Sequence, residues 1–247
     1  MSALDGTPSE GIRGLYPFLY DRTDHSEHDE HTGRADAGTA EVAAEAVRSA
    51  VEKTGEIVRL RGRMGAESVA ELAACAEEMA ARFVAGGRLF SFGNGGSSTD
   101  AQEVATAFLH PCRGPALPAL CLTGDVAVVT ALSNDVGFEV VFARQLAALG
   151  RPGDIAVGLS TSGGSANVVR AFEEAAHRGM LTVGLAGGGG GRLTELSGLG
   201  VLDHLFVVPS SSVHRIQEAQ TTLYHVLREL TWHALGSAPI PRAHSPG

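Results

Sequence analysis

Short apolar runs alternate with helical stretches through the middle of the chain. Continuous apolar runs of this length indicate strands buried on both faces, and a helical stretch after each run indicates parallel strands. We therefore expect an α/β fold, a three-layer αβα sandwich around a five-stranded parallel sheet. The expected strands are 88–92, 119–122, 155–159, 181–186 and 204–208.

Helical periodicity dominates both ends of this region. From 39 to 84 the residues are helix formers without Pro, and apolar positions recur at helical spacing, which predicts two helices broken near Gly62 and Gly65. The stretch 213–235 predicts a closing helix that stops at Gly236. The glycine run 187–191 predicts a mobile loop after the fourth strand.

The first 37 residues differ from the rest in being polar. Only the apolar segment 15–20 can bury surface, so we expect 1–37 to be a mostly disordered tail and 38–240 to form one domain. The tail's His25, His28 and His31 are potential metal ligands, but without fixed geometry we interpret them as solvated polar residues.

Charge and cysteine content narrow the class of protein. The chain of 247 residues carries a formal net charge of -9 and has no Lys/Arg cluster, which argues against direct nucleic-acid binding. No apolar stretch is long enough to span a bilayer, so we expect no membrane association. Cys75, Cys112 and Cys121 lack disulfide or metal spacing, which predicts buried, reduced thiols and a cytoplasmic location.

Two expected strands end in similar Gly- and Ser-rich loops, at 91–98 and 160–167. Ligands of open parallel sheets bind at the carboxyl ends of strands, where glycines allow close approach and helix N-termini favour anions. The second loop supplies four hydroxyl groups within six residues, which predicts a phosphate site at Ser160, Thr161, Ser162 and Ser165. The simpler alternative is that these residues only cap helices. Neither loop has the G-x-x-x-x-G-K-[ST] pattern of nucleoside triphosphatases, and a dinucleotide site is a weaker rival.

Several motifs occur in a specific order along the chain. They are SFGNGGSSTDAQ at 91–102, then SND-GF, GRPGD and STSGGSAN within 131–175, and HRIQEAQTTLYHVLREL at 214–230. In this combination the chain resembles the phosphoheptose isomerase branch of the SIS (sugar isomerase) family over about 38–235.

This resemblance implies a homotetramer with active sites between subunits. It also implies the interconversion of sedoheptulose 7-phosphate and an aldose through an enediol. The loop hydroxyls already named would hold the phosphate. Asn94, Ser97 and Asp135 match positions that line the sugar, while Gln217 and His225 match positions at the reacting carbons, which in some members ligate zinc.

The chain departs from the family pattern on one helix. Where the family carries a His and, four residues later, a catalytic Glu, this chain has Glu103 and Ala107. One hypothesis is an isomerase in which Glu103 replaces the missing base and His225 acts as acid or base. The alternative is a non-catalytic phosphosugar-binding module, similar to the relatives that bind the bacterial replication initiator. We expect no required cofactor, with zinc at Glu103, Gln217 and His225 as the less favoured option.

Overall fold

The structure is a computed structural model that describes residues 35–111 and 114–237. The predicted tail up to residue 34, with its three histidines and its apolar segment, lies outside the described residues, as does Cys112. Cys75 and Cys121 are buried and free, as expected. Burial, the largest effect, raises the pKa of the Cys75 thiol, which keeps it protonated and unreactive.

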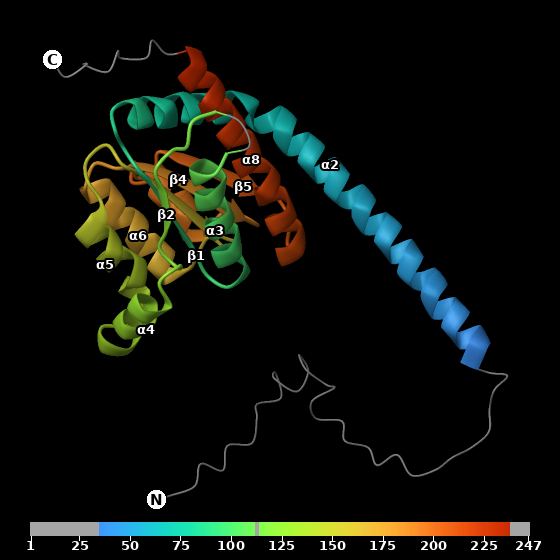
Figure 1. The fold of residues 1–247 in the computed structure, drawn as a ribbon. Helices are drawn as coiled ribbons and strands as arrows, with labels where there is room; N and C mark the ends of the chain where they lie inside the picture. The colour runs from blue at the N-terminus through green and yellow to red at the C-terminus, as the bar shows by residue number, and fades with distance from the viewer. Residues whose placement is uncertain (1–34, 112–113, 238–247) are drawn as a thin grey trace, which may run out of the picture. The chain divides into compact units, whose positions relative to one another are not determined.

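The core of the fold is the predicted five-stranded parallel sheet, with strand order β2-β1-β3-β4-β5 (Figure 1). The strands differ from the expected ranges by at most one residue at either end. Their bounds are β1 Leu89–Gly93, β2 Ala119–Cys121, β3 Ile155–Ser160, β4 Leu181–Gly187 and β5 His204–Val208. Because β1 lies between β2 and β3, the carboxyl ends of β1 and β3 are adjacent.

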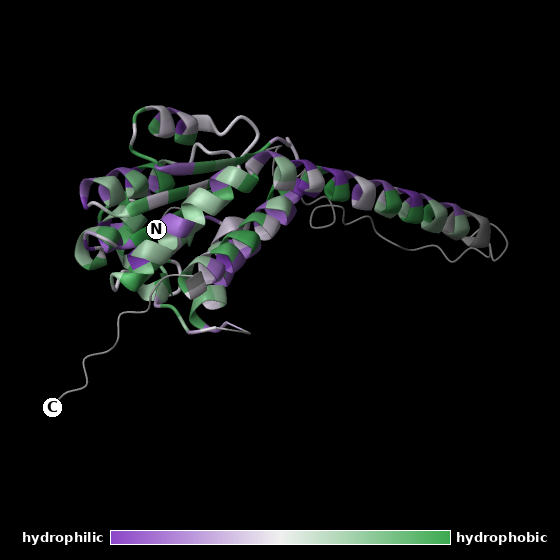
Figure 2. Ribbon diagram, turned by 90° about the horizontal axis from the view of Figure 1, so that it is seen from above, coloured by the Kyte–Doolittle hydropathy of each residue, from purple (hydrophilic) through white to green (hydrophobic). Residues whose placement is uncertain are grey.

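Helices cover both faces of the sheet, which confirms the three-layer αβα architecture. One face packs on residues of α2, α3 and α8, and the opposite face on residues of α5, α6 and α7. In Figure 2 the packing helices carry hydrophobic stretches interrupted by hydrophilic ones, as amphipathic cover helices should. The bounds are α2 Ala35–Val84, α3 Gly96–Leu109, α4 Val126–Asp135, η2 Phe138–Val140, α5 Val141–Leu149, α6 Ala166–His177, α7 Gly191–Gly198 and α8 Val213–Ser237.

The prediction of two N-terminal helices is wrong, because α2 is one continuous helix of 50 residues. A glycine inside a helix costs only about 1 kcal/mol relative to alanine and keeps its N–H donor, so it does not have to end the helix. Leu60 and Met64, which flank Gly62, are buried in the core and hold the helix across this stretch. In the described part of the chain, no helix offers an apolar stretch that would span a bilayer.

The glycine run after β4, which we expected to be a mobile loop, is a short turn in the structure. β4 ends at Gly187 and α7 begins at Gly191, which leaves three residues between them. Gly188 and Gly190 have φ angles of 63° and 79°. Glycine adopts this left-handed region without steric penalty, so the run allows the chain to reverse tightly beside the 160–165 loop.

Candidate functional site

The predicted phosphate-binding residues converge in the loop between β3 and α6. Ser160 ends β3 and is 4% exposed, and its hydroxyl lies 3.0 Å from that of Ser165. The Ser162 hydroxyl accepts a hydrogen bond of 3.2 Å from the Gly164 N–H, and Thr161 is half-buried between the two serines. Ser165 precedes α6 but makes no side-chain capping bond with it. The capping interpretation therefore does not explain this serine, and its hydroxyl remains available near the helix N-terminus.

Only glycine fits at the bend of this loop. Gly163 has a φ of 63°, and a Cβ atom there would collide with the carbonyl oxygen of Gly190. The 160–165 loop is thus held against the turn that precedes α7. In this loop Ser162 is exposed and Ser165, next to the first turn of α6, is half-buried, whereas Ser160 is buried.

A reciprocal amide pair joins the two Gly- and Ser-rich loops. Asn94, after β1, donates to Asn167 at 2.8 Å, and Asn167 donates back at 2.8 Å. Asn167 is 2% exposed, so this pair is largely shielded from water. Ser97 is buried in the first turn of α3, beside Gly93. The two loops, which are far apart in the sequence, therefore form one continuous polar edge of the sheet.

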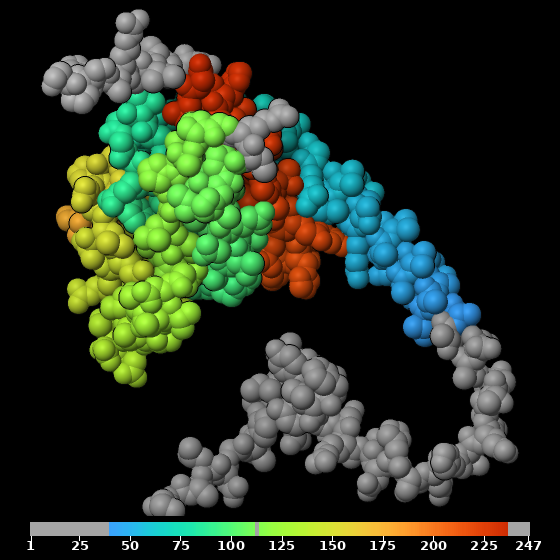
Figure 3. Space-filling model, in the orientation of Figure 1, coloured from blue at the N-terminus to red at the C-terminus, as the bar shows by residue number. Residues whose placement is uncertain are grey.

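Further along α3, Glu103 meets two side chains of α8. Its Oε2 accepts a 2.7 Å hydrogen bond from the Tyr224 hydroxyl, and its Oε1 lies 3.0 Å from Nε2 of His225. The Glu103 and His225 side chains are 49% and 36% exposed, so solvent and ligands reach both. Figure 3 shows α3 (green) and α8 (orange-red) meeting at the surface. A carboxylate, an imidazole and a phenol are thus assembled at one accessible position.

The Tyr224 hydroxyl is a fixed proton donor at this position. Burial is the main reason that the pKa of Tyr224 is raised, and the hydrogen bond to Glu103 raises it further, although the Thr221 hydroxyl acts in the opposite direction. The phenol therefore remains protonated at neutral pH and donates to the carboxylate.

A second contact between the helices lies nearer the start of α3. The Gln217 amide donates to Oδ2 of Asp100 at 3.1 Å, and a Cβ at Gly96 would collide with that same amide. Burial raises the pKa of Asp100, the Gln217 hydrogen bond lowers it, and the nearby charge of Glu103 raises it. Gln217 is therefore placed against the first turns of α3 by a glycine and a carboxylate.

The structure does not bring Asp135 to these residues. Asp135 is the last residue of α4, is exposed, and accepts a 2.8 Å hydrogen bond from its neighbour Asn134. Ala107, in place of the family's Glu, lies one turn after Glu103 on α3 and contributes no polar group.

Sequence reasoning did not single out Asp100, Tyr224 or Asn167, although all three lie inside the quoted motifs. Two of them could have been found from their spacing, because Asp100 precedes Glu103 by three residues and Tyr224 directly precedes His225 on a predicted helix.

The residues named for zinc do not form a metal-binding set. Glu103 and His225 meet, but both oxygens of Glu103 already have protein partners, and Gln217 points its N–H group at Asp100 instead. Among residues 35–111 and 114–237, no three His, Cys, Asp or Glu side chains cluster in a way that suits a metal ion. We therefore assign no chemical step to zinc.

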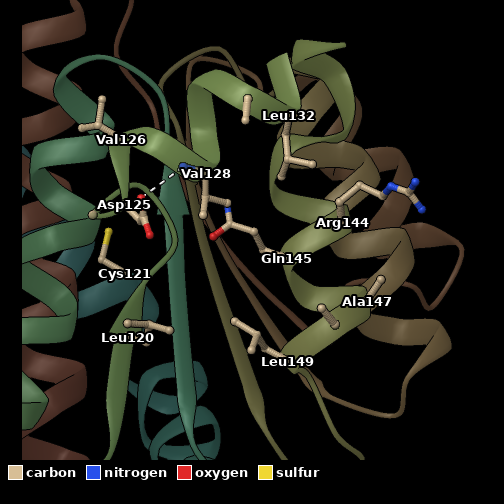
Figure 4. A pocket seen from close by; sticks show the side chains of 13 residues that line it. Leu120, Cys121, Asp125, Val126, Val128, Leu132, Arg144, Gln145, Ala147 and Leu149 are labelled. Atoms are coloured by element: carbon tan, nitrogen blue, oxygen red, sulfur yellow. Dashed lines mark hydrogen bonds between the residues drawn. The ribbon is translucent and has the colours of Figure 1, made fainter. Parts of the chain in front are cut away.

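An apolar hollow of about 1280 Å³ lies beside the edge strand β2, between α4 and α5 (Figure 4). Leu120, Val128, Leu132 and Leu149 line it, and the carboxylate of Asp125 accepts a hydrogen bond of 3.1 Å from the N–H of Val128 at the start of α4. With few polar groups, this hollow is poorly suited to a phosphosugar. The polar edge formed by the two loops and α3 is the better candidate.

Comparison with known proteins identifies the family of this chain. The SIS domain family model matches residues 54–187. A phosphoheptose isomerase of Roseiflexus sp. (strain RS-1) is 45% identical over 166 residues, covering 66% of this chain and 82% of the relative. One of Thermodesulfovibrio yellowstonii is 39% identical over 198 residues, covering 79% of this chain and 94% of the relative.

Solved structures lead to the same group. Phosphoheptose isomerase GmhA from Neisseria gonorrhoeae superposes with a TM-score of 0.69 at 34% identity, covering 78% of this chain and all of that chain (100%). A phosphoheptose isomerase from Francisella tularensis gives a TM-score of 0.63 at 33% identity, covering 74% of this chain and 98% of that one. The chain therefore belongs to the SIS domain family and, within it, to the phosphoheptose isomerase branch.

Proposed function

We propose that the chain is a phosphosugar isomerase that interconverts a ketose and an aldose through an enediol, with sedoheptulose 7-phosphate or a close analogue as substrate. The observation that carries this proposal is the contact of Glu103 with His225 and Tyr224, on the helix that begins at Gly96, just after the first Gly- and Ser-rich loop leaves β1. The names of the relatives support the same reaction class over a non-catalytic binding module.

The spacing along α3 suits a long phosphorylated sugar. The 160–165 loop is tied to Asn94 through Asn167, and α3 starts two residues later at Gly96. Glu103 follows Gly96 by seven residues, about 10 Å along the helix axis. A seven-carbon phosphate ester in extended form bridges such a distance, with its phosphate at the hydroxyls of the 160–165 loop and its carbonyl end near Glu103.

The chemistry requires a proton to move between adjacent carbons. In the proposed role, the Glu103 carboxylate removes a proton from the carbon next to the carbonyl, and the carbonyl oxygen takes a proton from His225. The resulting enediol becomes an aldose when Glu103 delivers its proton to the former carbonyl carbon and the hydroxyl of the first carbon returns a proton to His225. Tyr224 holds the carboxylate in place, and Gln217, two turns earlier on α8, donates to a sugar oxygen. Ser97 and Asn94 are proposed to contact the sugar hydroxyls.

The expected assembly is a cytoplasmic homotetramer that needs no metal cofactor. Six exposed valines along α2, at positions 42, 47, 51, 58, 69 and 84, support self-association, because exposed apolar residues on one helix favour contact with another apolar surface.

Incubating the purified full chain with sedoheptulose 7-phosphate and separating the products tests the activity. Formation of an aldose heptose phosphate is the expected result. Binding of the sugar phosphate without any conversion would contradict the isomerase proposal and favour the binding-module alternative.

A further inference from the structure

A second hollow, with a polar lining, lies away from the candidate site residues. It measures about 780 Å³, within the range of small-molecule sites, and it is formed by α2, the β5–α8 loop and the first turn of α8. It shares no residue with the 160–165 loop or with the Glu103 site. Its lining consists of Glu56, Arg59, Leu60, Gly62, Arg63, Pro209, Ser210, Ser211, Ser212 and Arg215.

The hollow is positively charged in a chain whose net charge is -9. Three arginines line it against one glutamate. Arg215 is already neutralised, because its guanidinium lies 2.8 Å from Glu218 and 3.3 Å from Glu56. The two remaining arginines, Arg59 and Arg63, therefore leave an excess of positive charge in the hollow.

Arg59 and Arg63 have no counter-charge within the described residues. No described carboxylate lies within ion-pair distance of either side chain. They are four residues apart on α2, so both project on the same side of the helix, where like charges repel by a few tenths of a kcal/mol. Two unpaired guanidinium groups on one side of a hollow can bind an anion between them through charge-assisted hydrogen bonds.

The opposite wall of the hollow supplies neutral hydrogen-bond donors. The hydroxyls of Ser211 and Ser212 make no hydrogen bond to another described residue. The carbonyl of Ser212 accepts a hydrogen bond of 2.9 Å from the N–H of Ile216, and this is the first hydrogen bond of α8. The N–H groups of the first turn of this long helix therefore have no intrahelical acceptor where they border the hollow. Guanidinium groups, hydroxyls and helix N–H groups are together a typical phosphate-binding set.

We propose that this hollow is a second anion site, which binds a phosphate-bearing small molecule independently of the 160–165 loop. Inorganic phosphate and a phosphate monoester present the same oxygen atoms to these donors, so both can occupy it. Arg59 and Arg63 bind the phosphate oxygens, Ser211 and Ser212 donate from the other side, and Arg215 is held in place by its two glutamates.

Isothermal titration calorimetry of the full chain with inorganic phosphate tests this proposal. The wild type should bind two phosphates per chain. Arg59→Gln combined with Arg63→Gln should weaken one of the two sites by about tenfold or more, and Ser162→Ala combined with Ser165→Ala should weaken only the other. Arg192→Gln, which removes an exposed arginine of α7 that pairs with Glu195, is the matched control and should bind as the wild type does.

Titration with sedoheptulose 7-phosphate separates the two sources of phosphate. If the hollow binds the monoester, the Arg59/Arg63 double variant should lose one of the two sugar-phosphate sites of the wild type. If the hollow binds only inorganic phosphate, the double variant should lose a site for inorganic phosphate and none for the sugar phosphate. Because Arg59 and Arg63 are exposed, the double variant should keep the wild-type melting temperature, so that folding does not confuse the result. A single phosphate site in the wild type, or two unchanged sites in the double variant, would overturn the proposal.

Discussion

Replacing Glu103 by Gln removes the proposed base while keeping the size of the side chain. The amide oxygen still accepts from Tyr224, which is 2.7 Å from Oε2, but an NH₂ group now faces Nε2 of His225 in place of the oxygen at 3.0 Å. Because the Glu103 side chain is 49% exposed, the lost interaction should lower the free energy of unfolding by only about 0–1 kcal/mol. Loss of a general base should lower turnover by about 10²–10⁴-fold.

The assay compares initial rates and binding for three proteins. Wild type, Glu103→Gln and the control Glu195→Gln are each given sedoheptulose 7-phosphate, and affinity is measured by calorimetry. Glu195 is an exposed carboxylate of α7 that pairs with Arg192, so its substitution should leave the rate unchanged. Glu103→Gln should bind the sugar phosphate as well as the wild type and turn it over far more slowly. Wild-type turnover by Glu103→Gln would refute the assignment of the base.

Four further predictions follow from the same structure. Ser162→Ala with Ser165→Ala should weaken sugar-phosphate binding by about 1.5–3 kcal/mol per lost hydrogen bond, with little change in the melting temperature of the free protein; unchanged calorimetric affinity would contradict the phosphate assignment. Asp154→Ala should lower the free energy of unfolding, measured in urea, by about 3–5 kcal/mol. The buried Asp154 carboxylate accepts from the backbone N–H groups of Arg151 and Arg88 and pairs with the Arg88 guanidinium, and a loss below about 1 kcal/mol would show the reasoning to be wrong. The pKa of Asp100 is raised in the fold above its ordinary 3.8, mainly by burial, so the fold favours the protonated carboxyl and loses this stabilisation as pH rises through the raised value. Asp100→Asn, which stays neutral, should therefore unfold at higher urea than the wild type at neutral pH, and the difference should close in acid. Native mass spectrometry should detect a tetramer, and a stable monomer would exclude the proposed assembly.

The central strands β1, β3 and β4 could be predicted from sequence because they are buried on both faces, whereas the edge strands β2 and β5 are partly exposed. Such strands are continuous apolar runs, and burial leaves little freedom in where they begin or end. β5 matches the predicted range, and β3 and β4 extend one residue beyond it, at Ser160 and Gly187. β1 is shifted by one residue, to Leu89–Gly93, and β2 ends one residue earlier, at Cys121. Helix α2 was harder to predict from sequence, because Gly62 and Gly65 resemble a break between two helices. The helix continues through them in the structure, where Leu60 and Met64 are buried in the core.

The candidate site was predictable as a set of residues but not as a geometry. The Gly- and Ser-rich loops can be identified locally, because glycine and hydroxyl residues at strand ends have few other uses. The pairing of Glu103 with His225 and Tyr224 joins helices more than 120 residues apart in sequence, and no periodicity specifies that contact. The same holds for the amide pair of Asn94 and Asn167, which forms only when the sheet places β1 beside β3.

Proton NMR of sedoheptulose 7-phosphate with the full chain in D₂O tests the central claim most directly, because the proton that the base removes from carbon exchanges with solvent before it returns, even when little product accumulates. Deuterium should replace hydrogen on the ketose carbon next to the carbonyl, and the exchange should be lost in Glu103→Gln. Sugar phosphate that binds but keeps its carbon-bound hydrogens in the wild type would contradict the claim that Glu103 and His225 move a proton on this substrate.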